Sequence, residues 1–357
     1  MKSKIKDKLI NFAQRTTAFL AFSAGFSGVM EAQEGASPEP DSLQNKMEIV
    51  KTPIEQPQDS ATVDFPVSVQ KDSVKEELFD SISKDPAKKR ICLETYRAAT
   101  DNDSIIAERR AKLDAAKEYM VYLIANFEGF KCKAYWDPLG KCYSYGIGNC
   151  ERADGKKVRA GDMIKSEEEG IAVVMHHIDE NMADDMIKYL PLERMSEVET
   201  AALGCLLYNT GSGKLRTKTN APSELSDIAT IHFLFRTDES EKEFREKFLS
   251  YKRTRSGSTV LLDRRQSEYA ILSGEVELPI EKLKGTMLGA LHGCHGDAEK
   301  INERFAPDSK FACPTDSLHY AMKQDLARTY VRKSTSSKAK GTQARGRAQP
   351  RPRSHTR

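Results

Sequence analysis

A run of apolar residues with helical spacing, ending at a glycine, constrains the fold of this chain more than any other feature. Because the apolar positions recur every three or four residues, they lie on one face of a helix. A glycine commonly ends such a helix. The pattern predicts a long helix that stops near Gly129 and places Glu128 at its C-terminal end. The apolar positions are Leu113, Ala116, Met120, Leu123, Ile124 and Phe127.

A β-hairpin signal follows this helix directly. In KCKAYWDPLGKCYSYGIGN, residues 131–149, aromatic and β-prone residues flank the turn signal Asp137-Pro138-Leu139-Gly140. Asp, Pro and Gly each favour the backbone geometry of a tight turn. We therefore expect two short antiparallel strands joined by this turn.

Capping patterns mark two further helices. Ser166 and Glu169 have the spacing of a capping box, ahead of an apolar pattern that continues to Met186. Ser196 and Glu199 repeat the same spacing. The sequence thus predicts a mostly α (α+β) fold with one small hairpin. Helices are also expected over residues 240–252 and 260–273, with mixed helix and loop over 281–330.

The composition leaves room for one core and long solvated segments. Of the 357 residues, 39% are hydrophobic and 31% are charged. Residues 33–85 are acidic and rich in Pro and Ser, with apolar side chains scattered singly, so we expect a disordered linker there. Residues 332–357 carry nine Lys or Arg and no Asp or Glu, which predicts a disordered basic tail. Such a tail contacts polyanions, with nucleic acid as one alternative, or serves only as a solubilising extension.

The N-terminal segment, residues 1–32, has the layout of a secretory signal peptide. A Lys-rich start precedes a weakly apolar stretch of small residues over 16–30, and Ala32 is available for cleavage. An uncleaved membrane anchor and an amphipathic surface helix are the alternatives. We expect an exported protein, periplasmic or extracellular, with membrane tethering by the N-terminus as a variant of that expectation.

Seven cysteines without a CxxC pair argue against a structural zinc site. An odd number leaves at least one thiol unpaired within the chain. In an exported protein a bridge such as Cys294 to Cys313 can form, although the spacing assigns no pairing. Buried free thiols are the alternative.

Glu128 and Asp137 form a pair suited to glycosidic bond cleavage. That reaction needs one carboxylic acid to protonate the leaving oxygen and a second carboxylate to direct water or stabilise positive charge. The negative end of a helix dipole at Glu128 opposes ionisation, whereas a polar turn at Asp137 favours the charged form. A Glu and an Asp nine residues apart are nevertheless common in proteins, so the pair by itself is a weak signal.

Four ordered segments resemble the phage-type lysozymes, the endolysins of glycoside hydrolase family 24. The first, IANFEGFKCKAYWDPLGKCYSYGIG, is similar to the family's helix-Glu-Gly and Tyr-x-Asp-x-x-Gly hairpin. GDMIKSEEEG is similar to the start of the family's second helix, ALGCLLYNTGSGKL to its Asn-x-Gly helix end, and LLDRRQSEYAIL to its Leu-x-x-Arg-Arg-x-x-Glu segment. Together they cover about residues 117–274.

The resemblance implies a lysozyme-like fold in which a small β-hairpin lobe and a helical lobe enclose a cleft for a glycan strand. It also implies a catalytic set of Glu, Asp and a hairpin Thr. Glu128 and Asp137 match in type and spacing. Ser144 stands in the Thr position, with one extra residue in the hairpin, and its hydroxyl is able to hold a water. Asn149 stands where many relatives carry His, and no role is assigned to it.

The candidate substrate-binding residues are Tyr135, Trp136, Asn209 and Arg264. Tyr135 and Trp136 suit stacking on sugar rings, but an aromatic pair beside a turn more often packs in a core, which is the favoured interpretation. Asn209 is expected to cap or buttress a helix end beside Gly211.

Two pairs of adjacent residues have both a functional and a neutral interpretation. Arg264 is expected to contact Glu128 or line the cleft, and the alternative makes Arg264 and Arg265 solvated helix charges. His176 and His177 diverge from a helix, so they are expected to be surface residues without a metal.

The leading hypothesis is a peptidoglycan hydrolase, a muramidase that cleaves the β-1,4 bond between N-acetylmuramic acid and N-acetylglucosamine. It needs no cofactor or metal, acts on glycan strands and is expected to be monomeric. The alternatives are a lytic transglycosylase, which needs no second carboxylate, and a non-catalytic wall-binding protein with the same fold. The predicted ordered segments are a helical lead-in (86–116), a catalytic domain (117–275) and a C-terminal extension (276–331).

Overall fold

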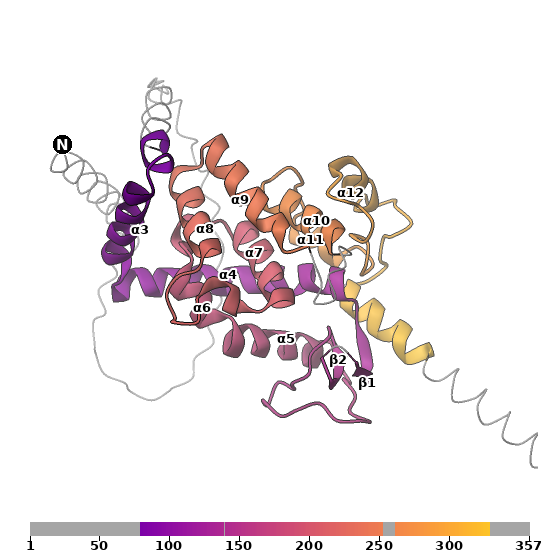
Figure 1. Cartoon of the computed structure of the whole chain (residues 1–357). Helices are drawn as coiled ribbons and strands as arrows, with labels where there is room; N and C mark the ends of the chain where they lie inside the picture. Colours follow the sequence, from indigo (N-terminus) through magenta and orange to yellow (C-terminus); the bar gives the residue numbers. More distant parts are fainter. Residues whose placement is uncertain (1–78, 139, 253–260, 329–357) are drawn as a thin grey trace, which may run out of the picture. The chain divides into compact units, whose positions relative to one another are not determined.

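A computed structural model describes residues 79–138, 140–252 and 261–328 (Figure 1). The predicted signal peptide or anchor, most of the predicted linker and the basic tail lie outside these residues. Among the described residues, no helix is both long enough and apolar enough to cross a membrane.

The chain divides into two compact units, residues 1–99 and 100–357. In the first unit, the described residues form a helical turn over 79–83 and most of helix α3 (Pro86–Thr100). Phe79 and Ile82 are buried. Residues 79–83 belong to the predicted linker, within which a short helical patch near residues 74–82 is compatible with the prediction. Buried aromatic and aliphatic side chains supply the apolar surface that ordering requires.

Helix α4 (Asp103–Glu128) confirms the long helix predicted from apolar spacing. It begins where the side-chain oxygen of Asn102 accepts a hydrogen bond from the backbone N–H of Ile105, 3.1 Å away. It ends at Gly129, whose φ of 72° is unfavourable for other residues and whose N–H bonds to the Ala125 carbonyl. Glu128 is therefore the last residue of the helix.

Strands β1 (Lys131–Asp137) and β2 (Cys142–Gly146) form the predicted hairpin. They are antiparallel, and Tyr135 pairs with Ser144 while Asp137 pairs with Cys142. At the turn, a Cβ atom on Gly140 would lie 2.6 Å from a carboxylate oxygen of Asp137, so only glycine fits there. The turn thus brings backbone directly against the Asp137 side chain.

Among the elements that pack on α4 are helices α5 (Glu167–Asn181), α6 (Ala183–Tyr189) and α7 (Glu197–Thr210), and the 3₁₀ turn η1 (Leu192–Arg194). Figure 1 shows α5 and α6 on one side of α4 and α7 on the other. The sequence pattern predicted one helix through Met186, but the backbone breaks at Met182, with φ −129° and ψ −36°. Neither Gly nor Pro occurs at this point, so the sequence carries no local signal for the break.

The two predicted capping boxes differ in detail. Ser196 and Glu199 form the complete reciprocal pair at the start of α7. At α5, the Ser166 hydroxyl accepts from the Glu169 amide, but the Glu169 carboxylate accepts from the amide of Lys165 instead. Both arrangements satisfy amide groups that a helix start leaves open.

The remaining elements are α8 (Glu224–Phe235), α9 (Asp238–Ser250), α10 (Leu262–Leu272), α11 (Ile280–Lys284), α12 (Ala298–Arg304), the 3₁₀ turn η2 (Ser212–Leu215) and a helical stretch over 317–328. Helix α8, which the sequence analysis did not predict, packs against α9. The mostly helical fold with one small hairpin is confirmed.

One hydrophobic cluster unites these elements. It contains the apolar face of α4 and the buried residues of α7 and α10. It also contains residues beyond position 275, namely Leu278, Leu283, Leu291, Phe305 and Leu318. The predicted boundary at 275 therefore lies within a shared core, and α4 runs continuously through the predicted boundary at 117.

His232 makes this core sensitive to acid. It is 7% exposed, its Nδ1 has no hydrogen-bond partner among the described residues, and its ring stacks on Phe244. Burial, with a smaller effect of the Arg236 charge, lowers its pKa from 6.5 to about 4. The unfolded chain then binds the proton more readily, so the free energy of unfolding falls as the pH drops from 6.5 toward 4.

We expect His232 to lower the free energy of unfolding by about 3 kcal/mol at pH 4. Urea unfolding of wild type and His232→Phe between pH 7 and pH 4 measures it, and parallel pH profiles would contradict it.

Candidate active site

Glu128 lies at the end of α4, beside a cation from α10. Its side chain is 28% exposed, and one carboxylate oxygen accepts a hydrogen bond from Nη1 of Arg264. The Arg264 guanidinium also lies over the Phe127 ring, with 4.9 Å between its carbon atom and the ring centroid. The positive charge of Arg264 therefore acts on Glu128 in addition to the helix dipole.

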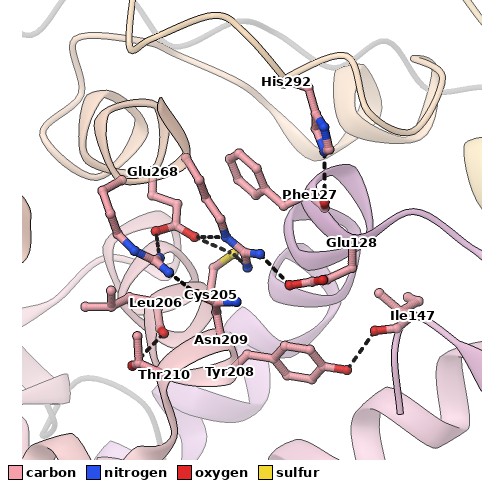
Figure 2. A network of polar contacts seen from close by, with 12 residues as sticks. Phe127, Glu128, Ile147, Cys205, Leu206, Tyr208, Asn209, Thr210, Glu268 and His292 are labelled. Atoms are coloured by element: carbon pink, nitrogen blue, oxygen red, sulfur yellow. Dashed lines mark hydrogen bonds and ion pairs between the residues drawn. The ribbon is translucent and has the colours of Figure 1, made fainter. Parts of the chain in front are cut away.

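Behind this contact, a buried polar network joins α10 to α7 (Figure 2). Arg264 Nε donates to Oε1 of Glu268 over 2.8 Å, and Arg265 donates to Oε2 of the same carboxylate. Arg265 also donates to the side-chain oxygen of Asn209. Glu268 therefore holds both arginines, one of which reaches the candidate acid.

The network excludes water almost completely. The side chains of Arg265 and Glu268 have no exposed surface. Cys205 lies within it, and burial together with the charge of Glu268 raises its pKa, so the sulfur stays a thiol and donates to Glu268 over 3.2 Å. The two arginines are balanced by the carboxylates of Glu268 and Glu128, and a buried charge requires such pairing.

The structure narrows two interpretations of this region. Arg265 is fully buried, which rules out the alternative that Arg264 and Arg265 are solvated helix charges. Asn209 does not cap α7, because Gly211 ends that helix with φ 88° and donates its N–H to the Leu207 carbonyl. The Asn209 side chain instead buttresses Arg265. Sequence spacing did not show the contact between Asn209 and Arg265, since it joins two helices across 56 residues of chain.

On the hairpin, Asp137 and Tyr135 lie near the candidate acid. One oxygen of Asp137 accepts from the Gly140 amide over 3.1 Å. Burial raises the pKa of the Tyr135 hydroxyl, and the negative charges of Asp137 and Glu128 raise it further. Asp137 ends β1, and β1 follows α4 directly, so the two candidate carboxyl groups come from consecutive elements.

Tyr135 and Trp136 are exposed rather than packed in a core. Their exposed fractions, 41% and 53%, are among the highest for large apolar side chains in the described residues. The favoured interpretation of these residues as core was wrong. The Trp136 ring contacts the Tyr143 ring edge-on, with centroids 5.3 Å apart, so one aromatic neighbour supports it while much of its surface stays open.

Ser144 is buried on the opposite side of its strand from Tyr143. Its hydroxyl lies 3.3 Å from the sulfur of Cys150 and 3.7 Å from that of Cys142, and these two cysteines form a disulfide. The bridge fastens β2 to the loop that follows it. Cys294 and Cys313, for which a bridge was considered, are unbridged. Ser144 thus contacts sulfur atoms, and its catalytic role stays a prediction.

Tyr208, which the sequence analysis did not select, joins α7 to the hairpin. Its hydroxyl lies 3.1 Å from the Ile147 carbonyl (Figure 2). It also lies 3.0 Å from the side-chain oxygen of Asn149. Burial raises its pKa, with a smaller effect of the Glu128 charge. The tyrosine within the Leu-Tyr-Asn helix end was the only signal for it in the sequence.

His177 packs against this tyrosine. The ring centroids of His177 and Tyr208 lie 4.9 Å apart, and burial lowers the His177 pKa. His177 is thus half-buried, not the surface residue expected. The two rings and Asn149 line part of a cavity of about 280 Å³. In the described residues, no three His, Cys, Asp or Glu side chains are grouped to hold a metal ion.

Comparison with known proteins identifies the part of the chain that builds this site. The family model described as phage lysozyme matches residues 125–268. No curated protein matches the chain. The matched range contains every candidate residue of the site, from Glu128 to Arg264. Over residues 125–268 the chain is therefore similar to the phage lysozyme family, and this similarity supports peptidoglycan hydrolysis as its general activity.

Proposed function

We propose that the protein is a muramidase that cleaves the β-1,4 bond between N-acetylmuramic acid and N-acetylglucosamine. In this mechanism Glu128 protonates the leaving glycosidic oxygen. Asp137, as a carboxylate, directs a water or stabilises the positive charge that develops on the sugar. No cofactor takes part in either step.

The observation that carries this proposal is the placement of two carboxyl groups on consecutive elements: Glu128 ends α4, and Asp137 ends β1, the strand that follows it. A glycosidase needs two carboxyl groups across one sugar, and these two residues supply such a pair. Arg264 gives Glu128 a fixed hydrogen-bond partner. A side chain held in one orientation protonates a bound substrate more effectively than a mobile one.

Further residues have supporting roles in the proposal. Tyr135 and Trp136 offer exposed aromatic faces on which sugar rings can stack. Asn209 acts indirectly, through Arg265 and Glu268, on the arginine that contacts Glu128. Ser144 would hold a water only if its hydroxyl turned away from the two sulfurs.

Product analysis of digested sacculi tests the reaction type. A muramidase releases fragments with reducing ends, and we expect these from the wild type. Asp137→Asn should lower turnover by about tenfold or more, because the amide cannot carry the negative charge. Anhydro sugars together with wild-type rates in Asp137→Asn would instead identify a lytic transglycosylase. Retention on sacculi without any cleavage would identify a wall-binding protein.

Export also belongs to this proposal, since the substrate lies outside the cytoplasmic membrane. The Lys-rich and apolar pattern of residues 1–32 supports it. The nine positive charges of residues 332–357 support contact with polyanions of the wall, in addition to the glycan strand. We propose that the protein acts as a monomer at this location.

A further inference from the structure

A glycine-rich loop beyond the matched lysozyme range lies against the base of the candidate site. We call residues 289–296, GALHGCHG, the clamp loop. Four of its backbone positions have positive φ, namely Gly289, Gly293, His295 and Gly296, with φ between 57° and 89°. Such a path lets the chain turn sharply and bring its amide groups close to neighbouring helices. Two of those neighbours are the helices that carry Glu128 and Arg264.

The clamp loop supplies donors to the last turn of α4. A helix leaves its final carbonyl groups without partners inside the helix. Here the Gly289 amide donates to the Asn126 carbonyl over 3.1 Å. The His292 ring nitrogen Nε2 donates to the Phe127 carbonyl over 2.8 Å, as Figure 2 shows. The two carbonyl groups that directly precede Glu128 are thus bonded to the loop.

The same loop also holds the first turn of α10. The carboxylate of Asp263, the residue before Arg264, accepts from the backbone amides of Gly293 and His295, the former over 2.6 Å. The Gly296 amide donates to the Ser267 hydroxyl over 3.2 Å. A Cβ at Gly296 would lie 2.8 Å from the Gln266 carbonyl oxygen, so the loop reaches backbone contact with this helix.

The loop is itself held in place from its outer side. Arg304 of α12 donates to the carbonyls of Ala290 and His292, over 2.8 and 2.5 Å. Lys300 donates to the Gly293 carbonyl. Leu291 is completely buried in the hydrophobic cluster. A loop fixed at this many points can transmit its own rigidity to the helix ends that it contacts.

We propose that the clamp loop is a positioning element for Glu128 and Arg264, with His292 as its central positioning residue. It holds the two helix ends in register, so that the hydrogen bond between Arg264 and Glu128 forms and the acid points at the substrate. His292 acts through the Phe127 backbone and does not touch the sugar. This inference rests on the proposed muramidase function, and it assigns a catalytic contribution to residues outside the family match.

The test compares full-length His292→Ala and His292→Gln with the wild type. A loosened helix end costs turnover and leaves binding intact, so we expect His292→Ala to lower kcat on soluble glycan fragments by about tenfold with KM unchanged. Hydrogen exchange of the Gly129 amide, the last bond of α4, should quicken on the order of tenfold. His292→Gln should restore both values, because its side-chain amide can donate to the Phe127 carbonyl. His319→Ala, which removes a histidine beside Glu167 elsewhere in the C-terminal region, is the matched control and should change neither.

Other outcomes overturn the proposal or separate it from the muramidase function. Unchanged kcat in His292→Ala overturns the proposal, whether or not exchange quickens, because the loop would then only stabilise the fold. If His292→Gln does not recover kcat, the hydrogen bond from residue 292 to the Phe127 carbonyl does not position Glu128, and the proposal is overturned. If the wild type cleaves no glycan while His292→Ala still quickens exchange at Gly129, the muramidase function fails and the mechanical contact between loop and helix stands.

Discussion

Replacing Glu128 with Gln should abolish most of the lytic activity and leave the fold intact. The amide is nearly isosteric, and its oxygen can still accept the hydrogen bond from Arg264. It has no proton to transfer to the glycosidic oxygen, and general acid catalysis is worth about 10²- to 10⁴-fold in rate. We therefore expect turnover to fall by about that factor in a turbidity assay on purified sacculi.

Glu118→Gln is the matched control for this variant. Glu118 lies on the same helix with its side chain 58% exposed, and its ion pair with Lys284 is a surface contact. Its replacement should leave lysis at the wild-type rate. Thermal unfolding shows whether each variant is folded. A folded Glu128→Gln protein that lyses sacculi at the wild-type rate would remove Glu128 from the mechanism.

The second large effect is expected on stability. Glu268→Ala leaves two arginines without the buried carboxylate that both of them contact. Removing one partner from a buried ion pair costs about 3–5 kcal/mol. Arg265 would lose the buried carboxylate that it contacts, whereas Arg264 would keep its ion pair with Glu128. We expect a loss of this size in the free energy of unfolding, measured by urea denaturation at pH 7.

Glu246→Ala provides the comparison, since Glu246 is an exposed residue of α9. Its replacement should change the free energy of unfolding by less than about 0.5 kcal/mol. Glu268→Gln should fall between the two, because it keeps an acceptor for one arginine and loses the charge. A loss below about 1 kcal/mol in Glu268→Ala would show that the network contributes little to stability.

Features of the site that depend on residues close together in the sequence could be predicted without the structure. Helix spacing and a terminal glycine placed Glu128 at the end of α4, and the turn signal at 137–140 placed Asp137 at the end of β1. Both predictions rest on residues that lie only a few positions apart in the sequence. Local backbone preferences are sufficient to determine such features.

The environment of the site could not be predicted in the same way. Tyr208 was not selected, and the arginine pair was left open between contact with Glu128 or the cleft and a solvated position. The break at Met182 and helix α8 were also missed. In each case the deciding contacts come from elements distant in the chain, and packing overrides weak local preferences. The disulfide of Cys142 and Cys150 likewise became assignable only when β2 and the following loop were placed together.

The resemblance to the phage-type lysozymes selected the two candidate carboxyl groups. The sequence by itself determined most of the element types and the ends of α4 and β1. These follow from local periodicity, caps and turn residues, which act over a few positions. Only the tertiary structure decided that Glu128 meets Arg264, that Glu268 holds both arginines, and that the clamp loop bonds to the end of α4. The physical reason is that hydrogen bonds and buried charges depend on distances of a few ångströms, and sequence spacing carries no such distance for residues that are 136 apart, as Glu128 and Arg264 are, or 165 apart, as Phe127 and His292 are. Glu268 contacts both arginines within one helix, but only the packing around that helix decided that these charges are buried.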